Sequence, residues 1–73
     1  MIRAELIKIG GMHCDACVGR VRRALEAREG LEVKEVIVGE AVVERDDERV
    51  DQPLLRETIE AQGFKLLTVE PLQ

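Results

Sequence analysis

Two periods run through the hydrophobic and polar positions of the chain, one of two residues and one of three to four. Short segments that alternate or are rich in β-branched residues predict four strands, over residues 2–9, 33–38, 41–45 and 64–69. Gly39 and Glu40 separate the two middle strands, and glycine at the first central position of a turn favours a type II′ hairpin. Gly10 and Gly11 end the first strand, and Pro71 closes the last.

Helical spacing of apolar residues appears first in the segment after the paired glycines. This segment begins at Asp15 or Ala16 and extends to Arg28. Its apolar side chains would form one buried stripe, made of Val18, Val21 and Leu25. Gly30 follows the expected end of this helix, where a residue in the left-handed conformation is common.

A second helix is predicted between the third and fourth strands, after the charged loop 46–49. Its N-cap is Asp51 or Gln52, and proline at position 53 suits a first helical turn. Leu55 and Ile59 would face the core, and Gly63 ends the segment.

The predicted order of elements is β-α-β-β-α-β. This order is typical of a ferredoxin-like α+β fold, a four-stranded antiparallel sheet with both helices on one face. The alternative is a smaller α+β unit in which the first or the second strand fails to form. Because the chain contains no linker, repeat or low-complexity tract, residues 1–73 are expected to form one domain.

Composition limits what such a domain can do. The 73 residues are 45% hydrophobic and 36% charged, and Phe64 is the only aromatic residue, so the core must be mainly aliphatic. A chain of this length hides only about 60% of its unfolded surface, which argues against a substrate cleft and therefore against an enzyme. No apolar run approaches the ~20 residues that span a bilayer, and no secretory signal is present, which indicates a cytoplasmic protein without direct membrane insertion.

The net charge of −4 is unevenly distributed along the chain. Residues 1–28 carry six basic and three acidic side chains, whereas residues 29–73 carry five basic and twelve acidic ones. A nucleic-acid-binding domain usually has a broad basic face and several aromatic residues for stacking. The sequence has neither, so we expect no nucleic-acid partner.

The candidate chemistry lies in Cys14 and Cys17, at the junction of the first strand and first helix. Free backbone N–H groups and the positive end of the helix dipole favour thiolate over thiol there. Arg20, one turn further on, adds a positive charge. In a reducing compartment such a pair more often binds metal or performs redox chemistry than forms a structural disulfide.

The pair suits some metal ions better than others. Soft thiolates select soft ions such as monovalent copper, which accepts a low coordination number. Structural zinc prefers four ligands, and the nearest further donor is His13, which directly precedes Cys14 and is poorly placed to complete the site. His13 is either a solvated loop residue or a weak third contact to the metal that tunes its release.

Residues 11–17, Gly-Met-His-Cys-Asp-Ala-Cys, resemble the G-M-x-C-x-x-C signature of heavy-metal-associated domains. This family includes copper chaperones, the metal-binding domains of copper-transporting P-type ATPases and mercuric-ion-binding proteins. The resemblance covers roughly residues 3 to 70. It includes Ile7 and Ile9 before the motif and the segments 30–31, 39–43 and 59–64 after it.

The resemblance implies that Cys14 and Cys17 hold one copper(I) ion per chain, supported by the loop residues Gly11 and His13. It implies that Met12 points into the core and is not a ligand, and that Phe64 sits over the metal loop. A cytosolic metallochaperone of this family would pass its ion to a copper-transporting P-type ATPase or to another C-x-x-C domain by ligand exchange. We expect a monomer, with a metal-bridged dimer as the alternative.

The first predicted helix also carries two arginines near the metal loop. Arg20 and Arg23 share one helix face near the metal loop and could form a basic docking surface, although a solvated helix face has equal weight.

One function that rivals copper transport is that of a metal-binding domain or sensor for mercury, silver, cadmium or zinc. The other is thiol–disulfide redox chemistry, although the motif lacks a flanking aromatic residue.

Overall fold

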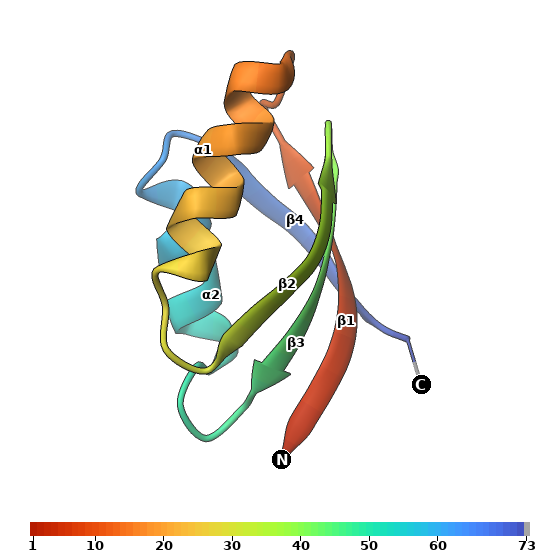
Figure 1. The fold of residues 1–73 in the computed structure, drawn as a ribbon, viewed down its shortest axis with the longest axis vertical. Coiled ribbons are helices and arrows are strands. Elements are labelled where there is room, and N and C mark those ends of the chain that lie inside the picture. The colour runs from red at the N-terminus through yellow and green to blue at the C-terminus, as the bar shows by residue number, and fades with distance from the viewer. Residues whose placement is uncertain (73) are drawn as a thin grey trace.

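The computed structural model describes residues 1–72. Four strands and two helices follow one another in the predicted order. They are β1 (Ile2–Gly10), α1 (Asp15–Glu26), β2 (Leu31–Ile37), β3 (Glu40–Asp46), α2 (Gln52–Glu60) and β4 (Lys65–Pro71). Both helices lie on one side of a single twisted sheet, which leaves the other side of the sheet open (Figure 1).

The sheet has the strand order β2-β3-β1-β4, and every neighbouring pair is antiparallel. Strand β1 is therefore central, and its C-terminal end delivers the chain directly to the loop that precedes α1 (Figure 1). A bulge in β4 opposite Lys8 and Ile9 shifts the pairing by one residue, which places Leu67 against Gly10. These observations confirm the ferredoxin-like fold and exclude the smaller alternative.

The core is aliphatic, with Phe64 as its single aromatic member. It fills the space between the inner face of the sheet and the two helices. The predicted stripes are confirmed: Val21 and Leu25 of α1 and Leu55 and Ile59 of α2 are buried, and Val18 packs at the margin of the core. Asp51 caps α2 as expected, because its side chain accepts a hydrogen bond of 2.9 Å from the Leu54 N–H.

The predicted type II′ hairpin is wrong. Ile37 is paired with Glu40 in the ladder, so the two central residues of the turn are Val38 and Gly39. Gly39 has a φ of +89° at the second central position, which is the arrangement of a type II turn. The register is fixed elsewhere, since pairing from Glu40 onward keeps alternate residues of β3 on the buried face.

Several element boundaries also differ from the predicted ones. Helix α1 ends at Glu26 rather than Arg28, and α2 ends at Glu60, before Gly63. Strand β2 begins at Leu31, and β4 extends to Pro71. Patterns of apolar residues do not specify these ends, because the terminal residues are held by sheet pairing and helix capping rather than by burial.

An ion pair is buried at the end of the core far from the cysteines. Glu5 and Arg45 are 4% and 3% exposed, although both belong to charged residue types. Arg45 donates to both Glu5 oxygens, over 2.7 and 2.9 Å, and to the Val50 carbonyl over 2.7 Å. The hydrogen bond and the negative charge of Glu5 raise the pKa of Arg45 above its ordinary value. Within residues 1–72 no buried side-chain nitrogen or oxygen lacks a hydrogen-bond partner.

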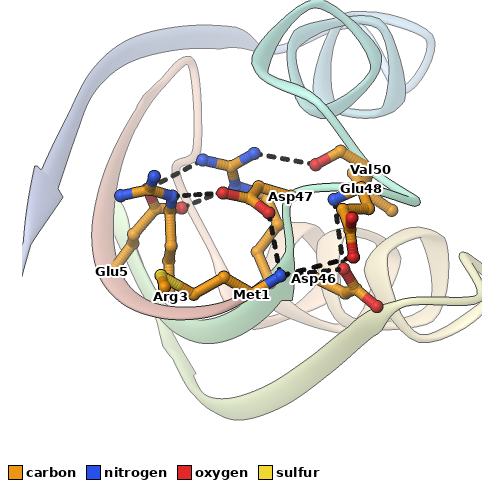
Figure 2. A network of polar contacts seen from close by, with 8 residues as sticks. Met1, Arg3, Glu5, Asp46, Asp47, Glu48 and Val50 are labelled. Atoms are coloured by element: carbon orange, nitrogen blue, oxygen red, sulfur yellow. Dashed lines mark hydrogen bonds and ion pairs between the residues drawn. The ribbon is translucent and has the colours of Figure 1, made fainter.

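A second, exposed network lies beside this pair. Figure 2 shows Met1, Arg3 and Asp47 next to Glu5. Asp47 accepts hydrogen bonds from Arg3, over 2.6 Å, and from the amino group of Met1, over 3.2 Å. The hydrogen bond from Arg3 is the main reason that the pKa of the Asp47 carboxyl is below its usual value. The polar network therefore links the start of β1 to the connection between β3 and α2.

The buried ion pair gives a stability prediction. The substitution Arg45→Met should lower the free energy of unfolding by about 3 kcal/mol, because it leaves the Glu5 carboxylate buried without its partner. The double variant Glu5→Leu/Arg45→Met should recover at least half of that loss, because it removes both charges. Urea unfolding followed by circular dichroism measures these differences.

The matched control is Arg49→Met, which breaks surface pairs with Glu29 and Asp46 (N–O distances 3.0 and 3.7 Å) and should change stability by about 1 kcal/mol or less. A double variant no more stable than Arg45→Met would contradict the role of the buried charge.

Candidate metal centre

The loop between β1 and α1 is shaped by Gly11. Its φ of +95° lies in the left-handed region, which glycine adopts without strain. A Cβ atom at this position would lie 3.4 Å from Cδ1 of Phe64, so a larger residue would also press on the ring. Gly11 thus shapes the loop through its backbone conformation and lies close to Phe64.

Both cysteines are placed at the start of α1. Cys14 is the N-cap residue, with extended backbone, and its carbonyl accepts hydrogen bonds from the N–H groups of Cys17 (3.0 Å) and Val18 (3.3 Å). Its side chain forms no capping hydrogen bond. The two Sγ atoms are 3.9 Å apart, with Cys14 exposed and Cys17 half-buried. The structure thus brings the two predicted ligands together at the surface.

The pKa of the Cys17 thiol is below its ordinary value. The largest cause is a hydrogen bond from the His13 backbone, with smaller contributions from Cys14 and from the positive charge of Arg20. Partial burial acts in the opposite direction. The net effect is a lower pKa, which raises the fraction of Cys17 present as thiolate at a given pH. Thiolate is the nucleophilic and metal-binding form of cysteine.

Met12 and His13 point to different environments. Met12 is 6% exposed and belongs to the hydrophobic core, so its thioether is packed against apolar side chains. His13 is exposed. Within residues 1–72 no group of three or more His, Cys, Asp and Glu side chains is arranged to hold a metal ion, so the candidate centre consists of the two sulfurs.

Phe64 and Arg20 meet beside the metal loop. Phe64 is 6% exposed, and the Arg20 guanidinium lies 5.3 Å from the centroid of its ring. Arg20 also donates a hydrogen bond of 2.7 Å to the carbonyl of Gln62. Arg23 instead lies along its own helix, and a Cβ atom on Gly19 would be 3.4 Å from its Nη1. Of the two arginines predicted to form a docking surface, one is thus engaged within the molecule.

Gln62 was missed by the sequence analysis. Gln62 accepts the hydrogen bond from Arg20 through its backbone carbonyl, in the turn between α2 and β4. Every residue has such a carbonyl, so the residue type does not indicate this contact. The nearby Gly63, with a φ of +90°, indicates a tight turn but not which carbonyl it exposes.

Two sulfurs in this geometry can bind one ion. Metal–sulfur bonds of about 2.3 Å allow the two sulfurs of one ion to be up to about 4.6 Å apart, and the observed 3.9 Å falls within that reach. A helix N-terminus carries a partial positive charge that stabilises the negative charge of the thiolates.

The fold and the paired cysteines define a class of small metal-binding domain. The model of the heavy-metal-associated domain matches residues 6–65, which is most of the chain. The protein belongs to the heavy-metal-associated domain family.

Two curated relatives show where such domains occur. The chain is 36% identical over 62 residues to the copper chaperone CopZ of Staphylococcus saprophyticus subsp. saprophyticus, a match covering 82% of this chain and 91% of CopZ. It is 37% identical over 60 residues to the "Probable copper-exporting P-type ATPase" of Archaeoglobus fulgidus, covering 82% of this chain but 7% of the ATPase. The domain therefore resembles both a whole small protein and one segment of a long one.

Solved structures have the same fold. The ZiaAN sub mutant, solved by NMR, superposes with a TM-score of 0.73 at 32% identity, covering 90% of this chain and 96% of the other. A CopZ metallochaperone gives 0.75 at 27% identity, covering 88% and 98%. A protein from Bacillus anthracis str. Ames gives 0.80 at 24% identity, covering 92% and 97%, which supports the fold alone.

The low pKa of Cys17 can be measured directly. In the variant Cys14→Ser, thiolate absorbance near 240 nm should titrate with a midpoint below that of a free cysteine, about 8.5, because the His13 hydrogen bond is retained. The same variant in urea should titrate at the ordinary value. A folded midpoint equal to the unfolded one would show that the loop does not stabilise the thiolate.

Proposed function

We propose that the protein is a metallochaperone that carries one copper(I) ion on Cys14 and Cys17 and transfers it to a partner with a similar thiol pair. The observation that supports this most is the placement of two sulfurs 3.9 Å apart at the start of a helix, with that of Cys14 exposed. Membership in the heavy-metal-associated family and the likeness to a copper chaperone point to the same conclusion.

The choice of copper(I) follows from the ligand set. Thiolate sulfur is a soft ligand, and soft ions of low coordination number are satisfied by two such ligands. Zinc would need further donors in a structural site, and neither His13 nor an acidic side chain forms a cluster with the cysteines among residues 1–72. Silver and mercury ions share the softness and are expected to bind as well.

Transfer would proceed by exchange of sulfur ligands. Because Cys14 lies on the surface, a thiolate of the partner can approach the ion and add as a third ligand. One original sulfur then leaves, and a second exchange completes the transfer. No atom changes oxidation state, and the protons that the partner thiols lose on binding the ion balance those that the released sulfurs take up.

The partner of this proposal is a C-x-x-C domain of a copper-transporting P-type ATPase. The likeness of the chain to a segment of such an ATPase supports it, because two domains of one fold can present their metal loops to each other. Arg23, exposed on α1, would attract an acidic partner surface, with Arg20 as a secondary contributor.

A reducing compartment is required, since the free thiols of Cys14 and Cys17 would otherwise oxidise. We therefore place the protein in the cytoplasm. Among residues 1–72 no helix is both long and apolar enough to cross a membrane.

The match to the ATPase also favours a second function, a metal-binding domain that works as part of a transporter. The chemistry of the cysteine pair would be the same in both cases. The two functions differ in whether the domain travels between partners or stays attached to one.

The two cysteines are tested by substitution. Cys14→Ser and Cys17→Ser should each abolish one-to-one copper(I) binding in competition with a chromogenic chelator under anaerobic conditions. The matched control is Met12→Leu, which replaces the other sulfur of the loop and should retain wild-type stoichiometry, because Met12 lies in the core. Wild-type affinity in both serine variants would place the site elsewhere.

Docking is tested by charge reversal. Arg23→Glu should slow copper transfer to an isolated ATPase metal-binding domain by about tenfold at low salt, because it opposes electrostatic steering. Arg56→Glu, which changes the same charge on α2, is the control and should have little effect. Equal rates for Arg23→Glu and wild type, at both low and high salt, would remove Arg23 from the docking surface.

A further inference from the structure

The guanidinium of Arg20 is fixed in place by two contacts outside its own helix. It donates a 2.7 Å hydrogen bond to the Gln62 carbonyl and lies 5.3 Å from the centre of the Phe64 ring. Both partners belong to the connection between α2 and β4. These two contacts to a segment outside α1 give the charge of Arg20 a defined position.

Phe64 connects the guanidinium to the metal loop. The ring of Phe64 is buried and lies close to Gly11. A Cβ atom added to Gly11 would be 3.4 Å from Cδ1 of the ring. Arg20 follows Cys17 by three residues in α1, a spacing that places the two side chains on the same helix face. The positive charge of Arg20 is therefore held on the helix face that carries Cys17, close enough to contribute to the lowered pKa of that thiol.

A fixed positive charge discriminates between ions by valence. Two thiolates with a monovalent ion form a complex of charge −1, whereas the same thiolates with a divalent ion form a neutral complex. A neighbouring cation stabilises the first complex and has no net charge to attract in the second. Because both ions displace the same protons from the same metal-free protein, the protonation state of the cysteines cancels in the ratio of the two affinities.

We propose that Arg20, positioned by Phe64 and the Gln62 carbonyl, biases the cysteine pair toward monovalent ions over divalent ions. This inference rests on the proposed metal binding by Cys14 and Cys17 and adds a residue that determines its specificity. The positive end of α1 acts in the same direction, and Arg20 adds a full charge to it.

The test measures affinities for copper(I) and cadmium(II) on the same reduced protein, each by competition with a chelator. In Arg20→Gln the ratio of copper(I) to cadmium(II) affinity should fall about fivefold, as expected for the loss of one charge at a solvent-accessible site. Arg23→Gln removes an equal charge three residues further along α1 and should change the ratio by less than about twofold. Wild-type protein in 1 M salt should have a ratio closer to that of Arg20→Gln.

Two further variants separate charge from structure. Arg20→Lys keeps the charge and should retain most of the wild-type ratio, although it loses the planar guanidinium. Phe64→Leu keeps Arg20 but removes the ring, and should shift the ratio part of the way toward that of Arg20→Gln. Circular dichroism and urea unfolding of each variant show whether its fold is intact, and the ratio is compared only among folded variants.

The outcomes distinguish the inference from the function on which it rests. If wild-type protein binds neither ion at one per chain, the proposed function fails. If wild-type protein binds both ions but Arg20→Gln leaves the ratio unchanged, or Arg23→Gln lowers it equally, the inference about Arg20 is overturned while the function stands. A ratio lowered equally in Arg20→Lys and Arg20→Gln would also overturn it, because charge would not be the cause.

Discussion

The start of helix α1 is the constraint on which the candidate metal centre depends. A helix begins with backbone N–H groups that need partners, and Ser, Thr, Asp or Asn usually supplies one at the N-cap. Here the N-cap is Cys14, whose side chain makes no capping bond. A better cap would stabilise the helix by about 1 kcal/mol, and the protein forgoes that stability to leave the positive end of α1 beside two sulfurs.

The cysteine loop and the buried ion pair lie at opposite ends of the sheet. The cysteine loop follows the C-terminal end of β1, whereas Glu5 and Arg45 are buried near its N-terminal end. In the buried pair, Arg45 donates to both oxygens of Glu5. The aliphatic core therefore lies between the cysteine loop and the buried ion pair.

The sequence predicts the order of elements, the buried stripes of both helices and the position of the cysteine pair, because periodicity and short-range spacing determine them. It does not predict the hairpin type, since the register of β3 is decided by pairing with β1 and β2. Burial of Glu5 and Arg45 is also invisible in the pattern, because charged residues at inward positions look like interruptions of a strand. The contact of Arg20 with Gln62 needs the tertiary structure, which brings residues 42 apart in sequence together.

The burial of Met12 has a consequence for the entropy of metal binding. Met12 fixes one end of the loop in the core, and α1 fixes the other from Asp15 onward. Only His13 and Cys14 lie between these anchors, so few backbone dihedral angles remain to be ordered when an ion arrives. Ordering the backbone of one residue costs about 1–2 kcal/mol in conformational entropy. In a loop this short, nearly all of that cost falls on folding rather than on metal binding.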